Sequence, residues 1–396
     1  MTRIVIEDDH FLKVLAVVLD PATPEPHCRA VADFFAHDEP DFAGWCRRLQ
    51  QKLPGLYPAE IVFAGNEAGL SAEIANADGI VVESLRVAEA SLDQAGPDQA
   101  NLDLTNVQKF GRDRAGHDRA GNAGARRLAI VHKYGTITSN IDVAACAARG
   151  IVVATLRRKV NVAVAEQAFA LMIALAKRIG QLNGVVEETA LRAAGLRIRP
   201  RQPRYIGYSN FAGVTGLKTL MGGTLGIVGM GEVGREVARR ARAFEMRLVY
   251  HQRTPLAPEL EQDFGASYLP FDDLMAQSDF VLVQLPLNEA TRGLIGRDAL
   301  ARLKPGAVVV DVARAELIDR DALIETLAAG RLGGLGLDVL YSEPSDPGEP
   351  LLAYRGGNVI LMPHTAVGSR ANALADVETL CLNLCHAIAA KRHGCP

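Results

Sequence analysis

The sequence lacks the features that would assign it to nucleic acid or to a membrane. Its 396 residues include 43 Lys and Arg and 46 Asp and Glu, so the formal charge is only -3 and no basic excess exists to attract polyanions. No apolar run approaches the roughly 18 residues that cross a bilayer. The apolar stretch 11–19 is interrupted by Lys13 and preceded by Glu7, Asp8 and Asp9, where a secretory leader would carry positive charge. We therefore expect neither nucleic acid nor a membrane as partner.

The cysteines show neither a disulfide framework nor a metal site. No C-x-x-C pair and no zinc spacing occurs among them. Cys381 and Cys385 lie four residues apart on an expected helix, where reduced thiols on one apolar face are far more common than a metal site. These features favour a reducing, cytoplasmic compartment. The cysteines are Cys28, Cys46, Cys146, Cys381, Cys385 and Cys395.

The amino-terminal part reads as alternating strands and helices. A chain of 396 residues exceeds one average core, so two domains are expected. Between residues 89 and 125 the alternation stops in a stretch rich in Gly and charge, which we interpret as an exposed loop or an insertion. Strands are expected at Val14–Leu19, Ile61–Ala64, Gly79–Val82, Leu128–Val131 and Ile151–Ala154.

From Thr224 onward, continuous apolar runs alternate with helices, which is typical of parallel strands covered on both faces. Helices are expected at Glu232–Phe244 and Arg320–Ala329. Another, 162–179, is apolar nearly all round and should be buried. A last helix, about 371–391, is expected to pack on the amino-terminal domain. The strands are expected at Leu225–Val228, Arg247–His251, Phe280–Leu285, Ala307–Val312, Leu335–Leu340 and Val359–Met362.

These patterns predict an α/β protein with two doubly wound domains. Residues 1–155 together with 370–396 are predicted to form a flavodoxin-like substrate domain. Residues 156–369 are predicted to form a Rossmann dinucleotide-binding domain.

A strand that leads into a helix through glycines is the most specific motif. Apolar residues 225–228 precede Gly229, Gly231 and Gly234 in the G-x-G-x-x-G spacing. Gly229 allows the tight turn, Gly231 lets the backbone approach a pyrophosphate, and Gly234 lets helix and strand pack closely. The helix amino terminus directs free N–H groups and a positive dipole end at the phosphates. The motif therefore predicts a dinucleotide site.

The end of the second strand of this domain indicates which dinucleotide is bound. An acidic residue about 20 positions after the glycines normally holds the ribose diol of NAD. Here Gln252 lies 18 positions after Gly234, and no carboxylate occurs nearby. Arg253 and Thr254 are suited to pair with a 2′-phosphate. We expect NADP to be preferred over NAD; the alternative is that Arg253 only faces solvent and both cofactors bind.

Three polar residues follow three expected strands, where ligands bind in open α/β sheets. They are Arg314, Glu343 and His364. Reduction of a 2-keto acid leaves charge on the carbonyl oxygen, which a histidine can protonate near neutral pH. A carboxylate fixes the imidazole tautomer, and an arginine fork holds a substrate carboxylate. Taken singly, each has a simpler explanation as a surface ion pair, a turn residue or a cap histidine.

Together with further segments, these residues resemble the D-isomer-specific 2-hydroxyacid dehydrogenases over roughly residues 127–390. The order Arg, Glu, His and the gap of 29 positions between Arg314 and Glu343 are typical of that family. The other matching segments are Ser139–Val143, Val164–Glu166, the glycine turn, Leu285–Leu287 with Thr291, Leu303–Ala307, Ala313–Arg314, Gly336–Val339, Glu343–Pro344 and Pro363–His364.

The resemblance implies a role for each site residue. His364 would be the general acid and base, Glu343 its orienting partner and Arg314 the substrate anchor. The loop 133–137 would bind the substrate carboxylate through backbone amides, with Gly135 in it. Lys133 would add a charge for a distal anion, unless it is a solvated loop lysine. Asp338 would meet the nicotinamide carboxamide, and further cofactor contacts would come from Glu232, Val233, Pro286 and Val312.

The chain departs from the family pattern at several positions. Ala315 follows Arg314 where Gly is usual, and Asp311 stands where Asn is common. Ile137 replaces a usual Gly in the substrate loop, and Arg157–Arg158 replaces a Pro-Gly or Pro-Asp segment. None of these changes touches the three catalytic residue types, but the loop changes leave the substrate open.

We therefore expect an NAD(P)-dependent oxidoreductase that transfers a hydride between the cofactor and a small 2-keto acid or D-2-hydroxy acid, with glyoxylate or hydroxypyruvate first. One alternative is a phosphoglycerate dehydrogenase; a formate or phosphite dehydrogenase is a second, although formate enzymes carry Gln in place of Glu343. A third is a dinucleotide-sensing, corepressor-like protein, which need not keep the catalytic set. A homodimer through the helix 162–179 and the following connection is expected by resemblance, unless that helix only joins the domains.

Overall fold

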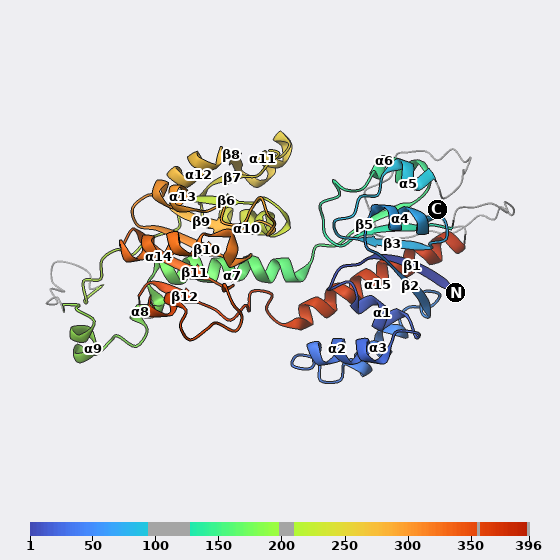
Figure 1. Cartoon of the computed structure of the whole chain (residues 1–396), viewed down its shortest axis with the longest axis horizontal. Coiled ribbons are helices and arrows are strands. Elements are labelled where there is room, and N and C mark those ends of the chain that lie inside the picture. Colours follow the sequence, from blue (N-terminus) through green and yellow to red (C-terminus); the bar gives the residue numbers. More distant parts are fainter. Residues whose placement is uncertain (94–126, 198–209, 355–356, 394–396) are drawn as a thin grey trace, which may run out of the picture. The chain divides into compact units, whose positions relative to one another are not determined.

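Two compact units make up the chain (Figure 1). Unit 1 comprises Met1–Lys159 and Ser369–Pro396, and unit 2 comprises Val160–Gly368. A parallel sheet of five strands lies in unit 1 and one of seven strands in unit 2, with helices on both faces of each. The predicted α/β class with two doubly wound domains is therefore confirmed. The computed structural model describes residues 1–93, 127–197, 210–354 and 357–393.

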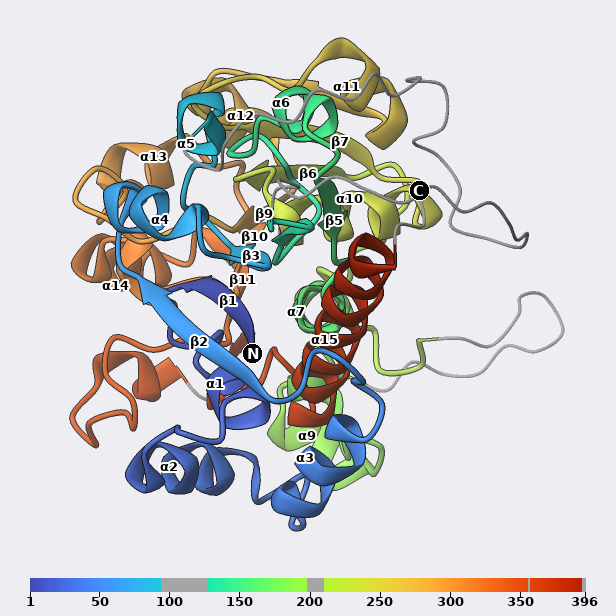
Figure 2. The same cartoon turned by 90° about the vertical axis from the view of Figure 1, so that its right-hand side faces the viewer.

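The sheet of unit 1 has the order β2-β1-β3-β4-β5, the flavodoxin-like arrangement. Helices α4, α5 and α6 cover one face, where their apolar residues share a core with Val5, Ile80 and Val131. Helix α1 packs on β2 and α15 on β4 at the other face (Figure 2). The strands are β1 (Thr2–Glu7), β2 (Ala59–Ala64), β3 (Gly79–Val82), β4 (Ile130–Lys133) and β5 (Val152–Thr155). The helices are α1 (Val14–Leu19), α2 (Glu25–Phe35), α3 (Phe42–Gln50), α4 (Glu67–Ile74), α5 (Glu89–Asp93), α6 (Val143–Ala148) and α15 (Arg370–Arg392).

The expected first strand, Val14–Leu19, was wrong, because this segment is helix α1 and the first strand is Thr2–Glu7. A short apolar run fits a buried strand and a buried helix equally well. The turn before α1 is organised by Asp9, whose carboxylate accepts the N–H groups of Phe11 and Leu12 at 2.8 and 3.0 Å. The interpretation of 89–125 as a loop was wrong for its first residues, which form α5; residues 94–125 lie outside the described part.

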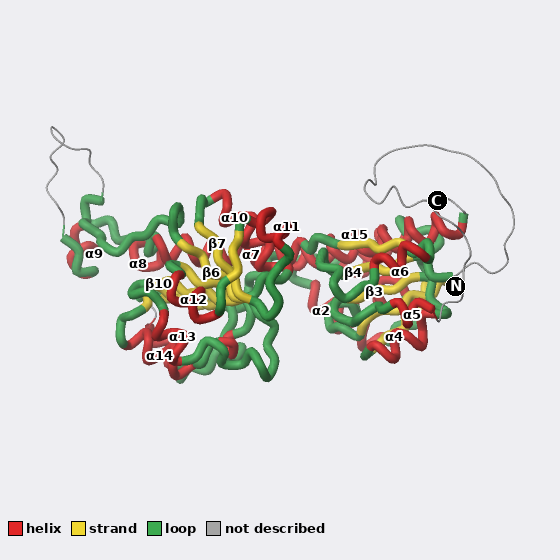
Figure 3. The backbone as a smooth tube through the Cα atoms, turned by 90° about the horizontal axis from the view of Figure 1, so that it is seen from above, coloured by secondary structure: helices red, strands yellow, loops and turns green. Residues whose placement is uncertain are grey.

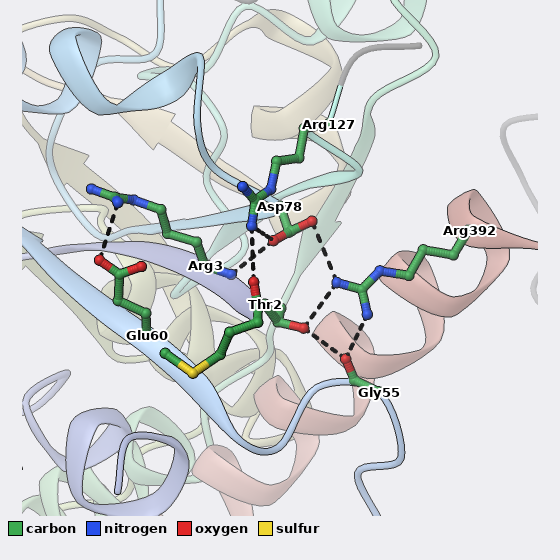
Figure 4. A network of polar contacts seen from close by, with 8 residues as sticks. Thr2, Arg3, Gly55, Glu60, Asp78, Arg127 and Arg392 are labelled. Atoms are coloured by element: carbon green, nitrogen blue, oxygen red, sulfur yellow. Dashed lines mark hydrogen bonds and ion pairs between the residues drawn. The ribbon is translucent and has the colours of Figure 1, made fainter. Parts of the chain in front are cut away.

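A polar network attaches the last helix to the first strand of unit 1 (Figure 4). The carboxylate of Asp78 accepts the backbone N–H of Arg3 at 2.7 Å and guanidinium groups of Arg127 and Arg392 at 2.7 and 3.5 Å. Arg392, at the end of α15, also donates to Thr2 Oγ1 at 2.9 Å and to the Gly55 carbonyl at 2.8 Å. The carboxyl-terminal helix is thus held to the amino-terminal end of β1, whereas Lys133 lies at the carboxyl-terminal end of β4.

The sheet of unit 2 has the order β12-β11-β10-β9-β6-β7-β8, the Rossmann arrangement with one further strand. Helices α7 and α10 share one core with the sheet, and α12, α13 and α14 share the core on its other face (Figure 3). The strands are β6 (Thr224–Val228), β7 (Arg247–His251), β8 (Ala266–Tyr268), β9 (Phe280–Val283), β10 (Ala307–Asp311), β11 (Leu332–Leu337) and β12 (Val359–Leu361). The helices are α7 (Lys159–Ala176), α8 (Ile179–Leu182), α9 (Glu188–Ala193), α10 (Glu232–Ala243), α11 (Pro258–Phe264), α12 (Phe271–Gln277), α13 (Arg297–Arg302) and α14 (Arg320–Ala328), with 3-10 turns η1 (Ala315–Leu317) and η2 (Pro350–Tyr354).

Two helices, α7 and α15, are long and apolar enough to cross a membrane by length and composition. The expectation that no segment approaches that length was therefore wrong, because it counted unbroken runs, whereas Glu166 interrupts α7 without making it polar overall. Half of each helix is buried inside the protein. Phe169 and Met172 of α7 lie in the core of unit 2, and Leu384 of α15 is fully buried in unit 1. Both are interior helices of their α/β units.

Candidate active site

The glycine turn lies between β6 and α10, as the motif predicts. Gly229 has a φ of 108°, and a Cβ there would lie 2.1 Å from the carbonyl oxygen of Gln284, which directly follows β9. A Cβ on Gly234 would lie 2.3 Å from the carbonyl oxygen of Gly229. Beside Gly231 the space is open, since no described atom lies within 4 Å of a Cβ built there. The amino terminus of α10 has no side-chain cap hydrogen bond, and such a helix end is a common binding position for anions. The turn fits a dinucleotide pyrophosphate.

The remaining expected cofactor residues lie at the same carboxyl edge of the sheet. Glu232 and Val233 open α10, Pro286 follows β9, and Val312 follows β10. All four strands β6, β9, β10 and β11 run parallel, so residues that follow them gather at one edge.

The end of β7 carries no carboxylate between His251 and Pro255. His251 Nδ1 pairs with the carbonyl of Leu269 at 3.0 Å, and Gln252 donates to the carbonyl of Thr254 at 2.6 Å, which closes a turn. Arg253 and Thr254 are exposed at its tip. The turn therefore presents a cation and a hydroxyl where an acidic residue would accept a ribose diol.

Sequence reasoning missed a second cation, Arg235, in the first turn of α10. Its Nε donates to the carbonyl of Met230 at 3.4 Å, so the side chain folds back on the glycine turn. Its guanidinium carbon lies 5.8 Å from the ring centroid of Phe264, and burial lowers the pKa of the group. The signal was its place directly after Gly234.

His364 and Glu343 form a direct pair. His364 Nδ1 lies 2.7 Å from Glu343 Oε2, while Glu343 Oε1 accepts the N–H of Leu340 at 3.0 Å. Both side chains are 39% exposed, so the pair is open to a ligand. Burial alone would raise the pKa of Glu343, but the hydrogen bonds from His364 and Leu340, with the charges of His364 and Arg314, hold this pKa below its usual value. The charge of Arg314 therefore acts on Glu343, which in turn pairs with Nδ1 of His364.

Asp338, at the end of β11, organises the turn that carries His364. His364 has a φ of 54°, a left-handed conformation that is unusual for a residue with a Cβ. Its N–H donates to the carbonyl of Asp338 at 2.8 Å. The fully buried Asp338 carboxylate accepts the N–H groups of Thr365 and Ala366 at 3.1 and 2.8 Å. These bonds hold the imidazole at the sheet edge; the expected carboxamide contact of Asp338 stays a prediction.

Arg314 follows β10 and begins the turn η1. It is exposed, and its Nη1 donates to the carbonyl of Ala313 at 2.6 Å, so the guanidinium folds over its own turn. Beneath the turn lies Asp311, which is fully buried and accepts the N–H of Ala313 at 2.7 Å. The three expected catalytic residues therefore come from the ends of β10, β11 and β12.

The expected substrate residues Lys133 and Gly135 belong to unit 1, at the carboxyl end of β4. Lys133 is only 6% exposed, so the alternative of a solvated loop lysine was wrong. Its Nζ donates to the carbonyl of Glu83 in the loop after β3. Tyr134 stacks on Phe11 with ring centroids 5.6 Å apart. Gly135 has a φ of 155°, and its carbonyl accepts the N–H of Leu156 at 2.8 Å.

Comparisons with known proteins agree with this geometry. The model for the NAD-binding domain of D-isomer-specific 2-hydroxyacid dehydrogenases matches residues 169–366. A glyoxylate reductase of Korarchaeum cryptofilum is 36% identical over 69% of this chain and 76% of that protein. A glyoxylate reductase of Pyrococcus furiosus is 35% identical over 69% of this chain and 75% of that protein.

A solved structure supports the fold. The D-mandelate dehydrogenase of Rhodotorula graminis superimposes with a TM-score of 0.52 at 20% identity, over 96% of this chain and 92% of that one. At this identity the likeness concerns the fold alone.

Proposed function

The chain belongs to the D-isomer-specific 2-hydroxyacid dehydrogenase family and is an oxidoreductase acting on a CH–OH group. We propose that it reduces glyoxylate, with hydroxypyruvate as a second substrate. The observation that carries the chemistry is the 2.7 Å pair between His364 Nδ1 and Glu343 Oε2, beside Arg314 at the edge that also bears the glycine turn. The glyoxylate reductases among the relatives support the substrate.

In the proposed mechanism, each of the three residues has one task. The Arg314 guanidinium binds the substrate carboxylate and polarises its carbonyl. His364, protonated on both nitrogens, would donate its Nε2 proton to the carbonyl oxygen of the substrate. A reduced nicotinamide bound at the glycine turn would supply the hydride for the carbonyl carbon. Glu343 keeps the Nδ1–H in place and stabilises the imidazolium before transfer. After transfer the neutral imidazole takes a proton from solvent, and the product leaves as a 2-hydroxy acid.

A test of this function is a panel of 2-keto acids with NADPH and NADH, followed by cofactor absorbance. We expect turnover with glyoxylate and hydroxypyruvate. Turnover restricted to phosphohydroxypyruvate would favour the phosphoglycerate dehydrogenase alternative. Tight cofactor binding without turnover of any acid would favour a dinucleotide sensor and contradict the proposal.

We also propose that NADP is the preferred cofactor. The exposed Arg253 and Thr254, the missing carboxylate after β7 and the second cation Arg235 all favour a 2′-phosphate. Arg253→Ala is expected to lower kcat/KM for NADPH roughly tenfold, the scale of one charged hydrogen bond, and to change that for NADH little. Equal losses for both cofactors would remove Arg253 from the phosphate site.

We propose further that the protein is a cytoplasmic homodimer. Five of its cysteines are free thiols, as a reducing compartment requires. In the described part of the segment that follows α7, Ile179, Val186 and Met221 are 50%, 68% and 62% exposed, and a second copy of the chain would cover such apolar side chains. Light scattering at micromolar concentration is expected to give twice the mass of the chain, and a monomer mass would contradict this assembly.

A further inference from the structure

Asp311 is a buried acid that the proposed reaction does not use. It ends β10, and its side chain is 0% exposed. Its Oδ1 accepts the N–H of Ala313 at 2.7 Å, whereas its Oδ2 has no hydrogen-bond partner among the described residues. A buried carboxylate with one oxygen lacking a hydrogen bond is unfavourable, because the neighbouring donors offset only part of the desolvation of the charge.

The turn held by this acid is the one that carries Arg314. The Ala313 N–H binds Asp311, and the Ala313 carbonyl accepts Nη1 of Arg314 at 2.6 Å. One peptide unit on each side of Ala313 therefore connects the buried acid to the exposed guanidinium. The backbone carbonyl of Asp311 in turn accepts the N–H of Asp338 at 3.0 Å, and Asp338 holds the His364 turn.

Resting on the proposed function, we propose that Asp311 is a positioning residue for Arg314. As a neutral acid, Asp311 holds the Val312–Arg314 turn so that the guanidinium group faces the substrate carboxylate. Loss of its proton weakens the binding of the substrate carboxylate by Arg314. A new negative charge beneath the turn attracts the guanidinium inward and partly neutralises it. The substrate carboxylate then competes with an internal anion for the same cation.

The surroundings of Asp311 favour the neutral acid. Burial raises its pKa to about 8, and the N–H groups of Ala313 and Arg314, with the Arg314 charge, offset this only in part. Three titratable or charged groups face Asp311: Arg314 in the same turn, Glu316 in η1 and Tyr341 after β11. Burial and the charge of Asp311 raise the pKa of Tyr341. On β9, the residue paired with it is the uncharged Val283.

The linkage has a definite sign. Because the folded protein holds the proton more tightly than the unfolded chain, it binds more protons between about pH 4 and pH 8, so the contribution of Asp311 to stability falls as the pH rises through that window. Asp311→Asn keeps an acceptor for Ala313 and carries no charge. Its stability is therefore expected to gain on that of the wild type as the pH rises from about 4 to about 8.

The experiment compares wild type, Asp311→Asn and Asp311→Ala. The difference infrared spectrum between wild type and Asp311→Asn at neutral pH is expected to contain a carboxylic-acid C=O band that disappears as the pH rises past about 8. Oxamate, an unreactive carboxylate, is titrated into the enzyme with NADPH at each pH. Above about pH 8, the Kd of oxamate is expected to increase roughly fivefold more in wild type than in Asp311→Asn. In Asp311→Ala the KM for glyoxylate rises roughly five- to tenfold with little change in kcat, and Asn rescues it.

The outcomes separate this proposal from the proposed function. Absence of the acid band, or oxamate Kd values with the same pH dependence in wild type and Asp311→Asn, would overturn the role of Asp311 even in an active reductase. A band and a diverging oxamate Kd without turnover of any keto acid would support Asp311 and overturn the reductase assignment instead.

Discussion

The carboxyl edges of the two sheets differ, although both sheets are parallel and doubly wound. In unit 2 this edge is open. Arg314 is exposed, the His364 and Glu343 side chains are 39% exposed, and no described atom beyond the chain neighbours lies within 4 Å of a Cβ built on Gly231. In unit 1 the edge is closed by its own bonds. Lys133 donates to the Glu83 carbonyl, and the Glu7 carboxylate accepts from the loop after β3.

Glu7 shows how the carboxyl edge of unit 1 is closed by hydrogen bonds within the unit. At the end of β1, its carboxylate accepts the N–H groups of Glu83, Ser84 and Leu85 at 2.6, 2.8 and 3.0 Å, and the Ser84 hydroxyl. Burial alone would raise the pKa of Glu7, but these four donors hold it below its usual value. The strand-end position that carries the proposed catalytic residues in unit 2 therefore carries a carboxylate that holds a loop in unit 1. Variants of the open edge should alter rates. Variants of the closed edge should alter stability, except at Lys133, where this edge borders the expected substrate loop.

The largest expected effect is on the open edge. His364→Ala is expected to lower kcat/KM for glyoxylate by roughly two to four decades, because the general acid is lost, while the free energy of unfolding changes little. His386→Ala, an exposed histidine on α15, is the control and should match wild type. An unchanged rate in His364→Ala would remove this residue from catalysis.

Glu343→Gln should come next, with kcat/KM lowered roughly ten- to hundredfold. The amide oxygen still accepts Nδ1–H, but no charge stabilises the imidazolium. The loss should be smaller at acidic pH, where the imidazolium forms more readily. A loss that is constant with pH would contradict an electrostatic role.

Lys133→Met probes the closed edge where it borders the expected substrate loop. The KM for glyoxylate should rise roughly fivefold with kcat nearly constant, because the cation supports the loop after β3 and the amides at 133–137. Lys52→Met, which breaks only an exposed 2.7 Å pair with Glu378, serves as control. A fall in kcat of the same size as the rise in KM would place Lys133 among the reacting groups instead.

Glu7→Gln is expected to have the smallest effect on rate and a clear effect on stability. The amide NH₂ would face donors that a carboxylate satisfies, which costs about 1–3 kcal/mol near neutral pH. Since the pKa of Glu7 is lowered in the folded state, its stabilisation is present above the unfolded pKa and is lost as the pH falls. Urea unfolding at several pH values checks this, with the exposed Glu60→Gln as control. A deficit that grows toward acidic pH would contradict the account.

Local patterns predicted much of the open edge. The glycine turn, Arg314, Glu343 and His364 each follow an apolar strand, so short stretches of sequence place them at one sheet edge. The first strand was mistaken because Thr2–Glu7 has only three consecutive apolar residues, 4–6, whereas Val14–Leu19 is apolar throughout. The strand is defined by its pairing with β2 and β3. The burial of Lys133 was equally out of reach, since its ammonium group is held by the loop after β3, which is distant in sequence.

The most direct test of the central claim is the pH dependence of kcat/KM in both directions for wild type and His364→Ala. The account predicts that kcat/KM for glyoxylate reduction declines as the pH rises, whereas kcat/KM for oxidation of the 2-hydroxy acid declines as the pH falls. In His364→Ala, the two directions should no longer show this opposite pH dependence. Profiles in the variant that keep the wild-type opposition would show that another group moves the proton, and would contradict the account.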